Sequence, residues 1–188
     1  TNPVFLYQQN TMRDALVAGI NLNIFNKHCD RVKMANIAQM VNVLQSVILT
    51  DGEKMIKTPT YYVFKMYKEH QENTLVGSYT TTPLVNSPND NKDFPQLCES
   101  ASVDENGTIY STITNNSSTK SAKIKCQIAD TKVESITAEI LTGECHQKND
   151  FDNADNVKTV EFTDFRKLKD GFTAAIPACS VVKFVINK

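Results

Sequence analysis

The feature that most constrains this chain is a change in hydrophobic periodicity near residue 72. Before this point, apolar residues recur at helical spacing or gather in longer apolar runs. After it, apolar and polar residues alternate in short runs separated by turn residues, as in half-buried β-strands. We therefore expect two parts, an α/β segment over residues 1–71 and a β-rich domain over residues 72–188.

The first helix is expected over residues 10–25. Asn10 or Thr11 can cap its first turn, and Asp14 lies where a negative charge interacts favourably with the helix dipole. Its apolar residues recur every four positions: Met12, Leu16, Ile20 and Ile24. The spacing predicts an amphipathic helix with one apolar stripe.

The stretch that follows this helix is apolar but has no clean helical period. We interpret residues 32–50 as one or two buried strands with irregular backbone around Asn36 and Gln39. The sequence DGEK at 51–54 predicts a turn, and a second helix with a proline near its start is expected over about 59–70. Strand, turn and helix in this order are typical of an α/β layer.

The remainder of the chain predicts a β-sandwich. Asn106-Gly107 indicates a tight hairpin in which both residues tolerate positive φ, and Asp170-Gly171 repeats this signal. The polar stretch at 87–96 is expected to be a surface loop. The candidate strands are 74–82, 97–103, 108–115, 121–129, 133–142, 157–162, 171–176 and 180–187. Short strands with regular turns favour a jelly-roll-like antiparallel sandwich, so the fold class is mainly β with an α/β segment before it.

Charge and length exclude several classes of function. The chain has 188 residues and a net charge of −1, so it offers no strong positive field for nucleic acid or an anionic membrane. No apolar run approaches the roughly 20 residues that a membrane-spanning helix needs. The first residues lack the basic and apolar pattern of a secretion signal, and the compartment stays open.

No residue pattern predicts a metal or a cofactor. The three histidines form no ligand pair, and the acidic stretch at 149–156 lacks the glycine and the distal glutamate of an EF-hand, which favours a structural turn. Cys126 is expected to be a small core residue. The cysteines are far apart in the sequence and include no Cys-x-x-Cys pair: Cys29, Cys98, Cys126, Cys145 and Cys179.

Six strings of sequence are specific enough to suggest a family. They are TMRDALVAG (11–19), HCDRVKMANIAQMVNVLQSVILTDG (28–52), TPTYYVFKMYKEHQ (58–71), ILTGE (140–144), FDNADNVKTVEF (151–162) and IPACSVV (176–182). The first three resemble the end of the catalytic barrel of α-L-arabinofuranosidases of glycoside hydrolase family 51. The last three resemble the C-terminal sandwich domain of the same family.

This resemblance implies a function for a longer polypeptide. Such enzymes carry a (β/α)8 barrel before the sandwich and release terminal arabinofuranosyl groups from arabinan or arabinoxylan with retention of configuration. Their two catalytic glutamates lie upstream of the string that opens this chain, so we expect the chain to be a C-terminal fragment without catalytic residues. A barrel alone needs about 250 residues, which supports the same expectation.

The resemblance also assigns one binding residue and several partners. Gln39 matches the family's glutamine that hydrogen-bonds the arabinose ring, a role that suits a carboxamide at the rim of a barrel. The expected partners are an arabinose-containing poly- or oligosaccharide, bound through the intact enzyme, and further copies of the chain in a homo-oligomer. Without the rest of the barrel, residues 1–71 must pack against the sandwich or pair between two copies.

Two other interpretations stay open at this point. One is a stand-alone carbohydrate-binding β-sandwich, although the chain has no tryptophan to stack on sugars. The other is a purely structural assembly module, which is compatible with the leading interpretation.

Overall fold

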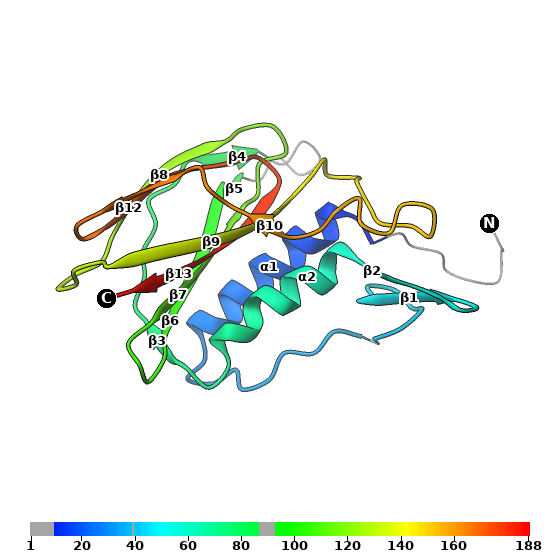
Figure 1. Cartoon of the computed structure of the whole chain (residues 1–188), viewed down its shortest axis with the longest axis horizontal. Coiled ribbons are helices and arrows are strands. Elements are labelled where there is room, and N and C mark those ends of the chain that lie inside the picture. Colours follow the sequence, from blue (N-terminus) through cyan, green and yellow to red (C-terminus); the bar gives the residue numbers. More distant parts are fainter. Residues whose placement is uncertain (1–9, 39, 87–92) are drawn as a thin grey trace.

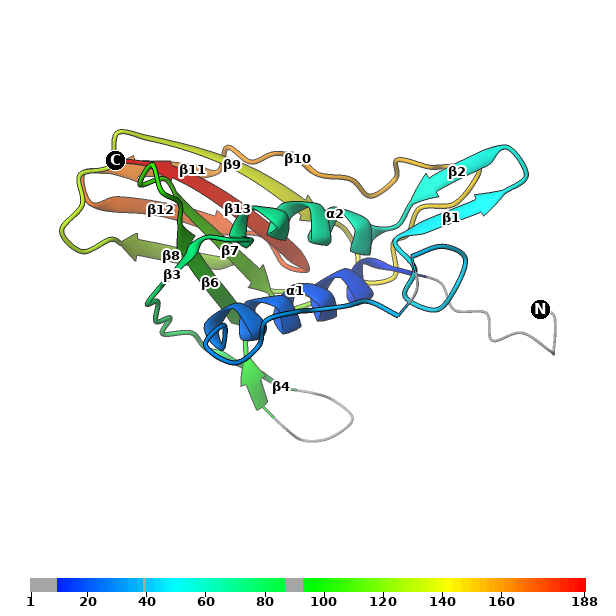
Figure 2. The same cartoon turned by 90° about the horizontal axis from the view of Figure 1, so that it is seen from below.

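The computed structural model describes residues 10–38, 40–86 and 93–188, which form three layers (Figure 1). The middle layer is an antiparallel sheet of β10 (Val160–Glu161), β9 (Ser135–Thr142), β13 (Ser180–Asn187), β7 (Ile109–Asn115), β6 (Leu97–Val103) and β3 (Thr74–Val76), in spatial order. A smaller antiparallel sheet covers one face, in the order β11 (Phe165–Leu168), β12 (Gly171–Ile176) and β8 (Ala122–Gln127). Two helices, α1 (Met12–Lys27) and α2 (Pro59–Tyr67), lie side by side on the other face (Figure 2).

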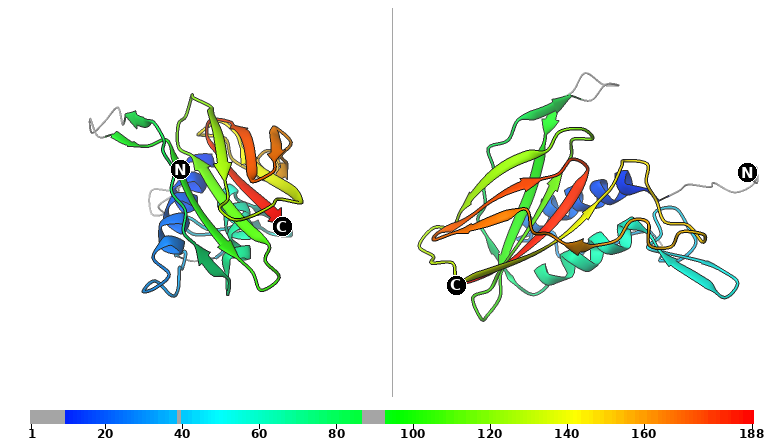
Figure 3. Two further views of the ribbon diagram at one scale, coloured as in Figure 1. Left: turned by 90° about the vertical axis from the view of Figure 1, so that its left-hand side faces the viewer. Right: turned by 45° about the horizontal axis from the view of Figure 1, so that its top comes forward.

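Shorter elements complete the chain. Two hairpins pair antiparallel: β1 (Ile48–Asp51) with β2 (Lys54–Lys57), and β4 (Leu84–Asn86) with β5 (Asp93–Pro95). A 3-10 turn, η1 (Lys68–His70), extends α2. Figure 3 shows that β4 and β5 project from the body of the molecule.

Strict alternation along β13 explains why the middle sheet has two buried faces. Val182 and Phe184 pack in the core between the two sheets, whereas Val181 packs in the core beneath the helices. The Phe184 ring lies 4.3 Å from the Phe172 ring of the small sheet, centroid to centroid. Fully burying one such side chain contributes about 1.5–3 kcal/mol. The predicted antiparallel β-sandwich is therefore confirmed.

Most strands predicted after residue 72 are present, and the errors there involve the shortest ones. The predictions at 97–103, 171–176 and 180–187 coincide with β6, β12 and β13. The predicted strand at 74–82 shrinks to the three residues of β3. The polar loop predicted at 87–96 is wrong over β5, while residues 87–92 lie outside the described part of the chain. Strands of three or four residues, such as β4, β5 and β11, are too short to show alternation.

Both predicted hairpins form, with turns that differ from the expectation. Residues 104–108 connect β6 to β7, and Gly107, not Asn106, has positive φ there, at +86°. In the second hairpin, Gly171 is already the first residue of β12. Its φ is +156°, and a Cβ atom would lie 2.1 Å from the backbone oxygen of Cys126. Glycine is required at this position by the close approach of β8.

Helix α1 begins at the predicted cap Thr11, but its buried face differs from the predicted stripe. Each step of four residues turns the helix by about 400°, so a strict four-residue repeat drifts around the axis. Ile24, at the end of the predicted stripe, is consequently 43% exposed. The buried face mixes steps of three and four: Met12, Ala15, Leu16, Gly19 and Asn23.

The buried strands predicted within residues 32–50 are wrong for most of that stretch. Met34 is 75% exposed and Met40 is 64% exposed, and the described backbone is irregular until β1 begins at Ile48. A buried parallel strand needs hydrogen-bonding neighbours on both sides. The described chain supplies one isolated parallel bridge, between Val41 and Ile48.

The two helices pack against the sandwich, which is one of the two arrangements expected for residues 1–71. Met12 and Leu16 of α1 and Met66 of α2 share a core with Leu141 and Val181 of the middle sheet. The expectation that residues 59–70 form a helix is confirmed, with a change to 3-10 geometry for the last turn.

Candidate functional site

Gln39, the predicted sugar ligand, lies outside the described residues. The two asparagines near it are described. Asn36 is exposed on the irregular segment, and Asn42 lies in the turn before β1 with a left-handed φ of +55°. The geometry of this turn therefore positions the residues that follow Gln39 in the sequence.

Asn42 closes the turn by imitating a strand partner. Its backbone N–H donates to the oxygen of Ile48, at 3.1 Å. Its side-chain oxygen accepts the N–H of Thr50 at 2.7 Å, and its side-chain nitrogen donates to the Thr50 hydroxyl at 2.8 Å. A bidentate side chain of this kind holds a loop without a regular ladder.

The turn is also attached to the start of α1. The Gln45 amide donates to the Asp14 carboxylate at 3.1 Å, and Asn10 donates to the oxygen of Ser46 at 2.9 Å. Burial alone would raise the pKa of Asp14, but hydrogen bonds from Thr11 and Gln45, with the Arg13 charge, outweigh it and lower the pKa. The carboxylate therefore stays ionised and keeps the turn in place.

Large apolar side chains are exposed at several positions in the N-terminal part of the chain. They occur on the outer side of α1, along the irregular segment and on β2: Val17, Ile24, Phe25, Met34, Met40, Val41 and Met55. We call these residues the N-terminal apolar set. Exposed apolar side chains on this many neighbouring elements suggest a surface that another polypeptide covers.

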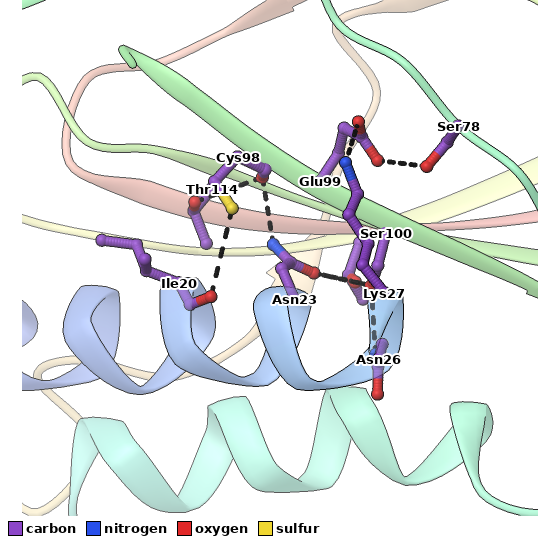
Figure 4. Close-up of polar contacts among 10 residues, drawn as sticks. Ile20, Asn23, Asn26, Lys27, Ser78, Cys98, Glu99, Ser100 and Thr114 are labelled. Atoms are coloured by element: carbon purple, nitrogen blue, oxygen red, sulfur yellow. Dashed lines mark hydrogen bonds and ion pairs between the residues drawn. The ribbon is translucent and has the colours of Figure 1, made fainter. Parts of the chain in front are cut away.

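A second polar cluster lies buried between α1 and the middle sheet (Figure 4). Asn23 is fully buried; its amide nitrogen donates to the oxygen of Cys98 at 3.0 Å. Its amide oxygen accepts the hydroxyls of Ser100 and Thr112, each at 2.8 Å. Both the oxygen and the nitrogen of the Asn23 carboxamide thus form hydrogen bonds to the sheet, which indicates a structural role.

His70 extends this cluster from the end of α2. Its two ring nitrogens lie 2.8 Å from the Ser102 hydroxyl and 3.0 Å from the Thr112 hydroxyl. Burial, and secondarily the Lys183 ammonium, lower the pKa of His70 from 6.5 to about 4. The neutral ring therefore acts as a hydrogen-bonding spacer between helix and sheet.

The buried carboxylates among the described residues each form hydrogen bonds or ion pairs within the fold. Glu99 is 7% exposed, forms an ion pair with Lys27 at 2.6 Å and accepts the Ser78 hydroxyl. Asp14 is engaged with Thr11 and Gln45. Cleaving a glycosidic bond needs two carboxyl groups facing one cavity, and these two groups belong to separate structural networks.

The acidic stretch at 149–156 forms the expected structural turn. The Asp150 carboxylate accepts the backbone N–H of Asn153 at 2.8 Å. Asn149 is buried and bridges the oxygens of Lys57 and Val157, each at 2.8 Å. Across residues 10–38, 40–86 and 93–188, three or more His, Cys, Asp or Glu side chains nowhere converge to hold a metal ion.

Sequence reasoning singled out Gln39 and the irregular backbone around Asn36 but missed the cluster around Asn23. The available signal was weak: Asn23 falls on the face that Met12 begins, eleven positions further along α1. Neither helix of the described chain combines the length and apolar character required to cross a membrane.

Comparison with known proteins identifies the family. The family model for the alpha-L-arabinofuranosidase C-terminal domain matches residues 1–180. An intracellular exo-alpha-L-arabinofuranosidase from Bacteroides ovatus is 42% identical over 178 residues, which cover 94% of this chain and 34% of that protein. A probable alpha-L-arabinofuranosidase C from Aspergillus clavatus is 31% identical over 133 residues, covering 68% of this chain and 26% of that protein. The chain thus spans between about a quarter and a third of the length of these curated relatives.

Solved structures agree over the whole chain. The family 51 arabinofuranosidase from Xanthomonas axonopodis pv. citri matches with a TM-score of 0.93 and 39% identity, covering 100% of this chain and 38% of that one. A family 51 enzyme from Bifidobacterium longum shares the fold, with a TM-score of 0.85 at 20% identity, and covers 100% of this chain and 37% of that one. The chain therefore belongs to the alpha-L-arabinofuranosidase C-terminal domain family.

Proposed function

We propose that this chain is the C-terminal part of a retaining α-L-arabinofuranosidase that releases terminal arabinofuranosyl residues from arabinan- or arabinoxylan-type glycans. The observation that carries the proposal is the family match over residues 1–180, together with relatives of which the chain covers about a third. Its two buried carboxylates, Asp14 and Glu99, are committed to structural contacts. We assign bond cleavage to the part of the enzyme that lies upstream.

We further propose that residues 1–71 supply the last elements of a (β/α)8 barrel and that residues 72–188 form the sandwich that supports it. The N-terminal apolar set favours this division, because the exposed side chains lie on α1, β2 and the segment between them. An upstream barrel packed there would remove this apolar surface from water, at about 25 cal/mol per Å². The single parallel bridge between Val41 and Ile48 is consistent with a segment that completes its strand pairing with another part of the enzyme.

Gln39 is the residue that we propose contacts the sugar. The turn that follows it is held by the hydrogen bonds of Asn42 to Thr50. Gln45 attaches the same turn to the start of α1. A carboxamide can donate to one sugar hydroxyl and accept from another. This role rests on the resemblance and on the anchoring of the neighbouring turn.

A chimera tests the proposal for Gln39. The upstream two thirds of the Bacteroides ovatus relative would be joined to this chain, and hydrolysis of an aryl α-L-arabinofuranoside measured. Gln39→Ala is expected to lower kcat/KM roughly 10- to 100-fold, the usual effect of losing one or two hydrogen bonds to substrate. The matched control, Gln71→Ala, changes an exposed carboxamide after η1 and should leave kcat/KM unchanged.

The alternative function, a stand-alone carbohydrate-binding module, makes a different prediction for the isolated chain. Calorimetry with arabino-oligosaccharides would then show saturable binding that survives Gln39→Ala. Equal activity of the Gln39→Ala and Gln71→Ala chimeras would remove Gln39 from the binding site.

We also propose that the enzyme is a homo-oligomer. The β4–β5 hairpin supports this, because it projects from the sandwich and carries exposed apolar side chains, with Leu84 60% exposed and Phe94 37% exposed (Figure 3). A projecting apolar hairpin is better covered by another subunit than by solvent.

A further inference from the structure

Two thiols that are distant in the sequence meet beside the start of α1. The sulfur of Cys145 lies 3.2 Å from the sulfur of Cys179. Both cysteines are free; Cys179 is 2% exposed and Cys145 is half-buried. A disulfide brings two sulfurs to about 2 Å, so these atoms need to approach each other by little more than 1 Å.

The pair lies at a junction between layers. Cys145 belongs to the loop at 143–148. Its backbone oxygen accepts the N–H of Arg13 at 2.9 Å. In the same loop, the oxygen of Gln147 accepts the N–H of Met12 at 2.9 Å. These two bonds satisfy N–H groups in the first turn of α1, which have no partner within the helix.

Cys179 is held on the other side of the junction. It directly precedes β13, and its N–H donates to the oxygen of Ser117 at 2.8 Å. Its φ of +48° lies in the left-handed region, which costs energy for a residue with a side chain. The surrounding contacts therefore hold the thiol in one place, pointed at Cys145.

The two thiols differ in their access to solvent. Burial, together with the neighbouring Cys145 thiol, raises the pKa of Cys179 to about 12. Cys179 is therefore a protonated thiol at neutral pH. Cys145 is the sulfur that a dissolved reagent reaches first.

We propose that Cys145 and Cys179 form a redox-active dithiol site whose oxidant is a low-molecular-weight disulfide of the glutathione type. In the first step, the Cys145 sulfur attacks the disulfide, forms a mixed disulfide and releases one thiol. In the second step, the Cys179 sulfur loses its proton and attacks Cys145, which releases the second thiol. The two cysteines lose two electrons and two protons, and one dissolved disulfide is reduced to two thiols.

The crosslink would tie the loop at 143–148, which accepts the first N–H groups of α1, to the residue that precedes β13 of the middle sheet. It closes the chain between residues 145 and 179, which restricts the unfolded state. We therefore expect a rise of several degrees in Tm on oxidation. The amide protons of Met12 and Arg13 should also exchange more slowly, because their acceptors lie in the tethered loop.

The experiment uses the full chain carrying Cys29→Ser, which removes the one cysteine that is fully exposed. The reduced protein is incubated with oxidised glutathione and examined by intact mass, peptide mapping and thermal unfolding. The expected product has lost two hydrogen atoms, contains a Cys145–Cys179 peptide pair and unfolds at the higher Tm.

Two further variants separate this proposal from general thiol chemistry. Cys145→Ser should abolish both the crosslink and the Tm rise, whereas Cys126→Ser, which changes a half-buried thiol of β8, should keep both. A stable glutathione adduct on Cys145, a crosslink to any other cysteine, or unreacted Cys145 and Cys179 thiols would each overturn the proposal.

Discussion

Gly19 of α1 lies so close to Thr114 of β7 that a Cβ atom on residue 19 would come within 2.7 Å of the Thr114 methyl carbon. The oxygen of Gly19 also accepts the hydroxyl of Tyr67 from α2, at 3.0 Å. The absent side chain therefore lets α1 lie directly on the middle sheet and contact α2 at the same level.

Replacing this glycine should destabilise the protein. Gly19→Ala should lower the free energy of unfolding by about 1–3 kcal/mol, because overpacking outweighs the better helix propensity of alanine. Gly77→Ala, where no atom lies within 4 Å of the new Cβ, should change it by less than about 0.5 kcal/mol. Adding Thr114→Ser to Gly19→Ala should recover stability, since it removes the clashing methyl. Urea titration measures all three, and an unchanged Gly19→Ala variant would contradict the packing described here.

The buried carboxamide of Asn23 leads to a second prediction. Asn23→Ala leaves the hydroxyls of Ser100 and Thr112 without their shared acceptor, which should cost about 2–3 kcal/mol of folding free energy. Asn21→Ala is the matched control, because Asn21 lies on the exposed side of the same helix. Denaturant unfolding of the two variants measures this difference. Equal stabilities of Asn23→Ala and Asn21→Ala would show that the cluster contributes nothing to the free energy of unfolding.

His70 predicts a loss of stability in mild acid. In the unfolded chain its pKa is near 6.5, whereas the folded value is about 4, so between these pH values the unfolded state binds more protons. Stability should therefore fall by about 2–3 kcal/mol as pH drops from 6.5 toward 4. His70→Gln should flatten this dependence, whereas His28→Gln, at an exposed histidine, should leave it intact. A pH profile that His70→Gln does not change would refute the assignment.

The proposed oligomer can be tested on the β4–β5 hairpin. Leu84→Asp places a charge on the exposed apolar surface and should shift the molecules toward monomers. Tyr79→Asp is a useful comparison, because Tyr79 is 90% exposed but lies before the hairpin. Sedimentation velocity over a range of concentrations measures the effect in the chimera with the upstream part of the Bacteroides ovatus relative. A wild-type chimera that is monomeric throughout would remove this proposal.

The parts of the fold that the sequence predicts well are those in which local pattern and burial agree. Val182, Phe184 and Ile186 place apolar side chains on one face of a strand at every second position, and β13 forms over these residues. Pro59 marks the start of α2 for a similarly local reason. Such signals need no knowledge of the rest of the chain.

The errors arise where structure depends on distant partners. Residues 32–50 have the composition of buried strands, yet Met34 and Met40 are exposed. Before β1, the described chain pairs this stretch through one isolated bridge, from Val41 to Ile48. The meeting of Cys145 and Cys179 depends on how a loop packs beside β13, which no spacing reveals. Asn23 was missed because a buried asparagine has no periodic signature of its own.

The proposal that this chain lacks the catalytic carboxylates is tested by the rate at which the purified 188-residue chain releases para-nitrophenol from para-nitrophenyl α-L-arabinofuranoside. We predict a rate equal to that of buffer for the chain alone, and saturable hydrolysis once the upstream two thirds of the Bacteroides ovatus relative are joined to it. Saturable hydrolysis by the chain alone, abolished by Glu99→Gln, would show instead that these 188 residues carry the catalytic groups.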